Sequence, residues 1–222
     1  MDSNFMITAH GGALGTGRNS KLYFDTMKSI KPDAIEVDIM MRGDVLYLAH
    51  VLPPISLKRA IKLDSVFEYC KENNFRVNCD VKRKYLAKAI LSLAKKIGVT
   101  NLIYFTGEFC KEEVSDLTDG EAFVNTNFYS SKFALNVENL VSIKAYIDSF
   151  KNKLIRGINI KYQYATDEFL AKAREIGLNL SIYTVDDIEV LKRLISEKPS
   201  NITTNLIDKA NEMRAESTKV DF

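Results

Sequence analysis

The chain has 222 residues, 46% of them hydrophobic, and its 31 basic and 29 acidic residues leave a formal charge of +2. This composition supports a sizeable core and excludes a disordered chain, and the balanced charge excludes a general attraction to nucleic acid or to an anionic membrane. With four prolines, ten glycines and no long linker, we expect a single domain over residues 1–222.

The sequence carries no targeting or spanning signal that we recognise. The first ten residues, "MDSNFMITAH", have an acid where a secretory signal has basic residues. No apolar run approaches the ~20 residues of a membrane span. Cys70, Cys79 and Cys110 are odd in number and lack CxxC spacing, which indicates reduced thiols. We therefore expect a cytoplasmic protein without stable membrane insertion.

Strand-like runs alternate with helical patterns from one end of the chain to the other. The expected strands are Phe5–Ala9, Ala34–Ile39, Arg76–Val81, Asn101–Phe105, Ala122–Asn125, Gly157–Ile160, Asn179–Tyr183 and Asn201–Thr204. The clearest helical patterns cover 64–73, 84–98, 137–150, 167–177 and 187–196, and helices are poorly marked only between 105 and 136. Eight strands alternating with helices predict a (β/α)8 TIM barrel, with a doubly wound open sheet as the main rival.

Local signals indicate where several of these helices begin and end. Ser65 and Glu68 have the spacing of a capping box, and Thr166 precedes a helical pattern that opens with two acids. Gly98 and Gly177 stand where a helix gives way to the next strand, as glycines at helix C-termini do.

Ionisable residues gather at the C-terminal ends of the first three expected strands, where barrel enzymes build their sites. Within a strand, a spacing of two residues places side chains on the same side. A short run, "DVLYLA", extends the second strand through the turn at 42–44 and ends on the second of only two histidines. The residues concerned are His10, Glu36, Asp38, His50, Asp80 and Lys82.

These residue types together indicate phosphoester chemistry. Three carboxylates form an oxygen cage that suits one divalent cation, Mg²⁺ or Ca²⁺. Histidines pass protons at neutral pH, and a lysine beside a metal suits a phosphate oxygen. The alternatives are a loop cap or a pair with Arg42 for Glu36 and Asp38, and a simple ion pair for Asp80 and Lys82. These alternatives would each have to arise independently at the ends of neighbouring strands, whereas one functional site explains all of these residues together.

The same residues give the chain a resemblance to the glycerophosphodiester phosphodiesterase family. "AHGGALG" at 9–15 is similar to the family's His-Arg-Gly start, "PDAIEVDI" to its "ADAIELDV" strand, "LYLAHV" to its "VVIHD" and "CDVK" to its "IEIK". Near the C-terminus, "GLNLSIYTVDD" and "NITTNLID" resemble its "WTVN" and "GIITDYP" segments. The resemblance runs nearly from end to end.

The resemblance implies a metal-dependent barrel that hydrolyses glycerophosphodiesters to glycerol 3-phosphate and an alcohol. It implies that Glu36, Asp38 and Asp80 hold the metal, that His10 and His50 are the acid–base pair, and that Lys82 contacts the phosphate. The partner would be a small-molecule phosphodiester, with no nucleic acid involved. Of the two histidines, we expect His10 to be the base and His50 the acid.

The chain also departs from the family pattern in the substrate-binding residues. Gly11 replaces the arginine of His-Arg-Gly, which removes a phosphate contact that Arg18 would have to replace. Asp80 replaces a glutamate ligand, and Tyr183 replaces the tryptophan of "WTVN" as a stacking surface. We therefore assign Gly11, Arg18 and Tyr183, with Lys82, to substrate binding.

The family's usual insertion after the second histidine is missing, since "VLPPISLKRAIKLD" leads almost directly into the next helix. The pocket should then be more open, or be closed by another subunit of a homo-oligomer. Two alternatives stay open: a barrel that binds a phosphorylated ligand without hydrolysing it, and a phosphodiesterase for a different substrate of the lysophospholipid type.

Overall fold

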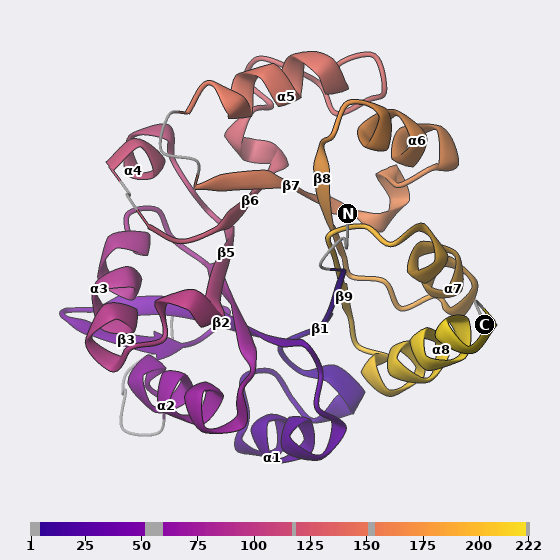
Figure 1. Ribbon diagram of the computed structural model, residues 1–222. Coiled ribbons are helices and arrows are strands. Elements are labelled where there is room, and N and C mark those ends of the chain that lie inside the picture. The colour runs from indigo at the N-terminus through magenta and orange to yellow at the C-terminus, as the bar shows by residue number, and fades with distance from the viewer. Residues whose placement is uncertain (1–4, 52–59, 117–118, 151–153, 221–222) are drawn as a thin grey trace.

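In the described part of the chain, eight parallel strands close into a barrel that a ring of helices surrounds (Figure 1). The computed structural model describes residues 5–51, 60–116, 119–150 and 154–220. β1 pairs with both β2 and β9, which closes the sheet and confirms the (β/α)8 TIM barrel over the open sheet. The barrel strands are β1 Met6–Ala9, β2 Ala34–Arg42, β4 Arg76–Val81, β5 Ile103–Gly107, β6 Ala122–Asn125, β7 Ile155–Lys161, β8 Asn179–Tyr183 and β9 Asn201–Thr204.

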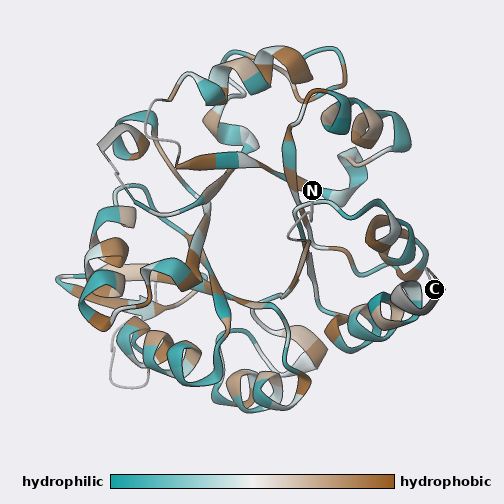
Figure 2. Cartoon of the chain, in the orientation of Figure 1, coloured by the Kyte–Doolittle hydropathy of each residue, from teal (hydrophilic) through white to brown (hydrophobic). Residues whose placement is uncertain are grey.

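The helices of the outer ring are amphipathic, and each carries both hydrophobic and hydrophilic positions (Figure 2). In α7, for example, the buried side chains are Leu191, Leu194 and Ile195, which recur at helical spacing and cover the barrel. No helix among the described residues is long and apolar enough to cross a membrane. The helices are α1 Lys21–Ile30, α2 Leu63–Asn73, α3 Ala87–Ile97, α4 Lys111–Asp116, α5 Leu140–Asp148, α6 Asp167–Glu175, α7 Ile188–Glu197 and α8 Ile207–Val220.

One strand lies outside the barrel wall and carries His50 back toward it. β3 Val45–Leu48 pairs antiparallel with the end of β2, with Tyr47 opposite Met40. Gly43, at φ 55°, makes the tight turn between the two strands. The predicted extension of the second strand is therefore confirmed. The expectation of a more open pocket depends on residues 52–59, which lie outside the described residues.

The barrel interior changes from apolar to polar toward the C-terminal ends of its strands. Met6, Tyr104 and Phe123 form a small buried cluster at the N-terminal end, where the two rings meet edge to face. Above them the Thr8 hydroxyl lies 2.8 Å from the Tyr104 hydroxyl and donates to the side-chain oxygen of Asn201 at 2.6 Å. These buried polar groups are hydrogen-bonded to one another, so their burial does not carry the free-energy cost of unpaired polar groups.

The helix signals were only partly correct. The prediction of a capping box at Ser65 is wrong, because α2 begins at the fully buried Leu63 and Ser65 lies inside the first turn. There its backbone N–H donates to the Asp64 carboxylate at 2.7 Å. Thr166 does cap its helix, since its hydroxyl accepts from the backbone N–H of Phe169 at 3.2 Å. Gly98, at φ 80°, ends α3 as predicted.

The fourth barrel strand lies two residues further along the chain than predicted. Residues Thr100–Leu102 form a short 3₁₀ turn, and β5 runs from Ile103 to Gly107 instead of from Asn101 to Phe105. The shift places Thr106 and Gly107 at the C-terminal end of the barrel. Gly107 has a φ of 103°, and a Cβ there would come within 2.3 Å of the Val81 carbonyl oxygen, so only glycine fits.

Candidate active site

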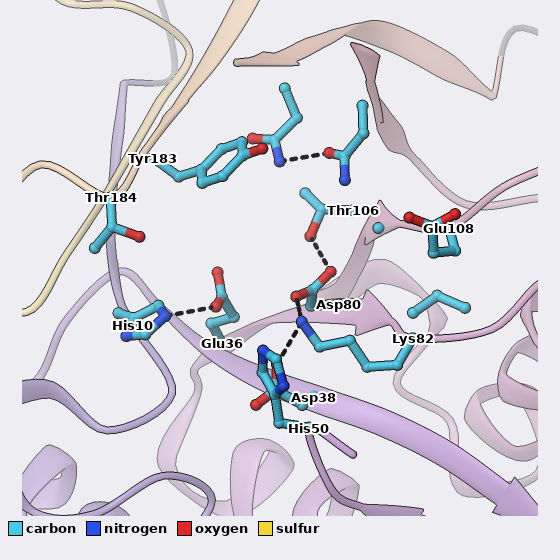
Figure 3. A pocket seen from close by; sticks show the side chains of 14 residues that line it. His10, Glu36, Asp38, His50, Asp80, Lys82, Thr106, Glu108, Tyr183 and Thr184 are labelled. Atoms are coloured by element: carbon cyan, nitrogen blue, oxygen red, sulfur yellow. Dashed lines mark hydrogen bonds and ion pairs between the residues drawn. The ribbon is translucent and has the colours of Figure 1, made fainter. Parts of the chain in front are cut away.

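A cavity of about 260 Å³ lies at the C-terminal ends of the barrel strands (Figure 3). It brings together seven of the nine residues predicted for the site, from positions 10 to 183 of the chain. The lining residues are His10, Glu36, Asp38, His50, Asp80, Val81, Lys82, Thr106, Gly107, Glu108, Asn125, Asn159, Tyr183 and Thr184.

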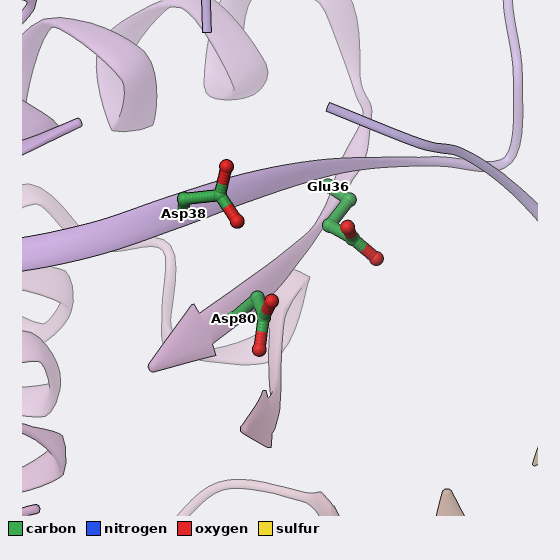
Figure 4. Close-up of side chains that lie close together, drawn as sticks. All are labelled: Glu36, Asp38 and Asp80. Atoms are coloured by element: carbon green, nitrogen blue, oxygen red, sulfur yellow. The ribbon is translucent and has the colours of Figure 1, made fainter. Parts of the chain in front are cut away.

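Three carboxylates converge at one side of this cavity (Figure 4). One oxygen of each of Glu36, Asp38 and Asp80 lies within 4.8 Å of the others. Glu36 and Asp38 are separated by one residue on β2, and the strand register pairs Asp38 with Asp80 on β4, so all three side chains point into the barrel. Glu36 is 7% exposed and Asp38 is 3% exposed, so neither charge is well solvated.

Lys82 lies among these carboxylates. Its Nζ is 2.7 Å from Asp38 Oδ1 and also pairs with Asp80 (Figure 3). Burial lowers the pKa of Lys82, but the charges of Asp80 and Asp38 outweigh it and raise that pKa, so the side chain remains an ammonium. The Lys82 ammonium and the Arg18 guanidinium, whose Nε lies 3.8 Å from Asp38 Oδ2, supply two positive charges against three acidic groups. The donor set is therefore under-neutralised and fits a divalent cation with oxygen ligands.

The environment of Glu36 disfavours the ionised form of its carboxyl group. Burial raises the pKa of Glu36 well above its usual value, the charges of Asp80 and Asp38 raise it further, and Lys82 and a hydrogen bond from Asn78 act in the opposite direction. Asn78 Nδ2 donates to Glu36 Oε2 at 3.0 Å, and the Thr106 hydroxyl donates to Asn78 Oδ1 at 2.9 Å. Glu36 is thus held in place by hydrogen bonds although its charge is poorly stabilised.

Without metal, we expect the stability of the protein to fall as pH rises because of Glu36. A carboxyl whose pKa is raised in the folded state binds its proton more tightly when folded, so its contribution is largest below the unfolded pKa and is lost as pH rises through the folded pKa. Glu36→Gln removes this contribution. In EDTA, the Tm of Glu36→Gln relative to wild type should therefore increase as pH rises above about 5, where the glutamate of the unfolded chain is ionised.

The matched control for this experiment is Glu175→Gln, which makes the same change at an exposed position paired with Lys172. Its Tm difference from wild type should stay constant over the same range. A constant difference for Glu36→Gln as well would show that the ionisation of Glu36 does not destabilise the fold.

The two histidines approach the carboxylates from different elements. His10 follows β1, and its Nε2 lies 3.6 Å from Glu36 Oε1, while its Nδ1 lies 2.9 Å from Asn205 Oδ1. His50 follows β3 and is exposed at the rim of the cavity. One histidine is therefore fixed by two neighbours, and the other has access to solvent.

Of the residues predicted to bind substrate, Lys82 and Tyr183 line the cavity, whereas Gly11 and Arg18 do not. The backbone of Gly11 passes beside the site, where a Cβ would lie 3.2 Å from the Glu36 carbonyl oxygen. Arg18 is exposed, with its Nε 3.8 Å from Asp38 Oδ2. Tyr183 is half-buried, and burial, followed by the charges of Asp80 and Glu36, raises its pKa, so it remains a neutral phenol.

Asn19 also contributes to the site, and the sequence analysis did not predict this. Its Nδ2 donates to Asp38 Oδ2 at 2.8 Å, and its Oδ1 accepts from the backbone N–H of Asp38 at 3.1 Å. The side chain thus fixes both the backbone and the carboxylate of Asp38. In the sequence, "NS" at 19–20 precedes a helical pattern and so indicates a helix start, but it carries no signal for this contact.

The wall opposite the carboxylates is polar and was also missed. Asn159 on β7 donates from Nδ2 to Asn125 Oδ1 on β6 at 2.8 Å. The Oδ1 atom of Asn159 is buried and accepts no hydrogen bond from the described residues. Glu108 lies at the mouth and accepts from Asn127 Nδ2 at 2.7 Å. Alternating polar residues at strand ends were the only sequence signal available, and asparagines there have many structural uses.

No protein-family model matches the chain, and no curated protein is similar enough in sequence to match it. Solved structures do match. A glycerophosphodiester phosphodiesterase from Parabacteroides distasonis has a TM-score of 0.75 and 14% identity over 98% of this chain and 100% of its own. A phosphodiesterase from Oleispira antarctica, in complex with the product sn-glycerol-3-phosphate, has a TM-score of 0.71 and 11% identity over 94% of this chain and 96% of its own.

The chain has the fold of the glycerophosphodiester phosphodiesterases. The likeness at these identities extends to the fold alone. A dihydropteroate synthase from Burkholderia cenocepacia also matches, with a TM-score of 0.58 and 9% identity over 97% of this chain and 91% of its own. Since one barrel fold serves unrelated reactions, the activity has to be argued from the residues of the cavity.

Proposed function

We propose that this chain is a metal-dependent phosphodiesterase that hydrolyses glycerophosphodiesters to glycerol 3-phosphate and an alcohol. The observation that carries the proposal is the grouping of three carboxylates, two histidines and one lysine in a single cavity. Metal-assisted phosphodiester hydrolysis uses a cation site, groups that move protons and a positive charge for the phosphate. The fold likeness to phosphodiesterases, one of them in complex with sn-glycerol-3-phosphate, supports the same assignment.

Glu36, Asp38 and Asp80 would hold one Mg²⁺ or Ca²⁺. When bound, such an ion polarises phosphoryl oxygens and lowers the pKa of an attacking hydroxyl. Lys82 now neutralises Asp38 and Asp80, at 2.7 Å from Asp38 Oδ1. With a cation held by these carboxylates, the Lys82 ammonium would no longer be needed to neutralise them and could contact a phosphate oxygen.

The two histidines move the protons. His10 takes the proton of the attacking hydroxyl, and His50, at the exposed rim, gives a proton to the oxygen of the leaving alcohol. If the attacking hydroxyl belongs to the substrate glycerol, the new P–O bond closes a cyclic phosphate as the bond to the alcohol breaks. Water then opens that ring, with the two histidines in reversed roles.

The polar wall supports a substrate that carries hydroxyl groups. Asn159 Oδ1 is a buried acceptor without a partner among the described residues, and leaving such a group unpaired costs about 1–3 kcal/mol. A ligand hydroxyl that donates to Asn159 Oδ1 removes this cost. Glycerol, with hydroxyls next to its phosphate, supplies the donor.

We expect Asn159→Leu to weaken the binding of glycerol 3-phosphate by about 3- to 10-fold, the loss of one hydrogen bond. Binding of ethyl phosphate, which has a phosphate but no hydroxyl on its carbon chain, should be unchanged. Titration calorimetry of both ligands in the presence of Mg²⁺ checks this. An equal loss for the two ligands would show that Asn159 acts on the phosphate or on the fold, and not on a hydroxyl.

The test of the proposed function is a panel of phosphodiesters assayed with Mg²⁺, Ca²⁺ and Mn²⁺, with EDTA as the control. We expect metal-dependent turnover of at least one glycerophosphodiester. Turnover of lysophospholipid-type substrates alone would show that the enzyme acts on a different class of substrate. Binding of glycerophosphodiesters without turnover in the presence of any of the metals would favour a non-hydrolysing barrel and overturn the proposal.

A further inference from the structure

A short chain of hydrogen bonds lies behind His10, on the side away from the cavity, and involves residues that have no role in the proposed reaction. His10 Nδ1 lies 2.9 Å from Asn205 Oδ1. Asn205 Nδ2 in turn donates to Asp186 Oδ2 at 2.7 Å, and the Asn205 backbone N–H donates to Asp186 Oδ1 at 2.8 Å. Both oxygens of Asp186 are thus engaged by the same residue.

The three residues come from the place where the barrel closes. His10 follows β1, Asn205 follows β9 and Asp186 follows β8, and these strands are neighbours in the sheet. The backbone ties them together, since the His10 N–H donates to the Thr204 carbonyl at 3.0 Å and the Thr204 hydroxyl donates to the Val185 carbonyl at 2.6 Å. The side-chain contacts therefore rest on paired strand ends.

These contacts determine which ring nitrogen of His10 carries the proton. A carboxylate can only accept, so Asp186 requires the amide nitrogen of Asn205 to face it. The amide oxygen then faces His10, and because that oxygen can only accept, His10 Nδ1 must donate. In the neutral imidazole the proton is then on Nδ1, and the lone pair is on Nε2.

The nitrogen left with the lone pair is the one at the cavity. His10 Nε2 lies on the side of Glu36, 3.6 Å from Glu36 Oε1, and His10 lines the cavity. Neither Asn205 nor Asp186 is among the residues that line it. Both can therefore act on the reaction only through His10.

We propose that Asp186 and Asn205 are positioning residues that hold His10 in its Nδ1–H form and so leave Nε2 as the proton acceptor. Their role in catalysis rests on the proposed function, but the tautomer does not. A base oriented by a third group recurs in enzymes that activate a hydroxyl. Here the group in contact with the imidazole is a neutral amide, and the charged residue lies one step behind it.

The tautomer can be read without any turnover. The chain has only two histidines, so ¹⁵N NMR of the ring nitrogens gives two spin systems, and His50→Gln identifies that of His10. In its neutral form, wild-type His10 should show a protonated Nδ1 and an unprotonated Nε2. Asn205→Leu, which removes the acceptor, should shift His10 toward the Nε2–H form.

The exchange variant Asp186→Asn/Asn205→Asp provides the matched rescue. It again places an acceptor against His10 Nδ1 and an amide behind it, with the same side-chain sizes, so it should restore the Nδ1–H form. For turnover, Asn205→Leu should lower kcat by about 10- to 100-fold, the usual effect of losing an orienting partner, with KM within about 2-fold of wild type. The exchange variant should recover most of kcat.

The outcomes distinguish the tautomer of His10 from its role in catalysis. An Nε2–H form in the wild type, or no change of tautomer in Asn205→Leu, would overturn the positioning role. The expected tautomers without cleavage of any phosphodiester would refute the proposed function and the catalytic role, while the hydrogen-bond assignment would stand. Circular dichroism and Tm measurements identify any variant that fails to fold, and the size-matched exchange variant then decides.

Discussion

His10→Ala and His50→Ala are each expected to lower kcat for glycerophosphodiester hydrolysis by about 10²- to 10⁴-fold, the range for removal of a general acid or base. The histidines lie in the same cavity as the carboxylates, His10 with its Nε2 3.6 Å from Glu36 Oε1 and His50 at the rim. Each removes or supplies one proton, so neither can replace the other in a single step.

The assay is the initial rate of release of glycerol 3-phosphate at saturating metal. Calorimetric binding of Mg²⁺ or Ca²⁺ to both variants is the control, because neither histidine is assigned to the metal and affinity should stay close to wild type. A variant that retains more than about a tenth of kcat would show that its histidine is not an acid or base in the reaction.

Asp38→Asn and Asp80→Asn are expected to weaken metal binding by more than about 100-fold, since loss of even an outer-shell partner costs 10- to 100-fold. Activity should be lost with the metal. Both carboxylates lie in the set whose oxygens are within 4.8 Å of one another, and Asp38 is 3% exposed, so a neutral amide removes charge where solvent cannot replace it. Calorimetry with Mg²⁺ and Ca²⁺ measures the change.

The matched control is Asp148→Asn, which changes an exposed carboxylate paired with Lys144 on α5. It should leave metal binding and activity unchanged. Lys82→Met is the contrasting variant: it removes a cation that now pairs with Asp38 and Asp80, so metal affinity should not fall, while kcat should. Unchanged metal affinity in Asp38→Asn and Asp80→Asn would contradict the assignment of the cation site.

The carboxylate side of the site could be predicted because its geometry follows from strand periodicity. Glu36 and Asp38 are two residues apart on β2, and Asp80 on the neighbouring β4 is followed two residues later by Lys82, just past the end of that strand, so each pair points to the same side. Parallel strands end at the same side of a barrel, so the two pairs must meet. The sequence also offered an ion pair between Asp80 and Lys82, and this pair is present, but the sequence could not predict that Lys82 pairs with Asp38 as well.

The opposite wall and the contacts of His10 could not be predicted, because they depend on contacts between distant parts of the chain. His10 and Asn205 are 195 residues apart and meet only because β1 pairs with β9. The position of Thr106 in the cavity was missed because the sequence analysis placed the strand two residues too early. Nothing in "TNLIYF" distinguishes a 3₁₀ turn from a strand. The Ser65 error has a similar cause: burial of Leu63 decided where α2 begins.

In the proposed reaction, the carboxylate cage and the two histidines cleave a glycerophosphodiester with the help of a divalent cation. The most direct measurement is ³¹P NMR of a glycerophosphodiester incubated with EDTA-treated protein, recorded before and after an excess of Mg²⁺ or Ca²⁺ is added. We predict no change before addition and conversion of the diester signal to that of glycerol 3-phosphate afterwards. A diester signal that stays unchanged with every metal, while calorimetry shows the metal bound, would contradict the account.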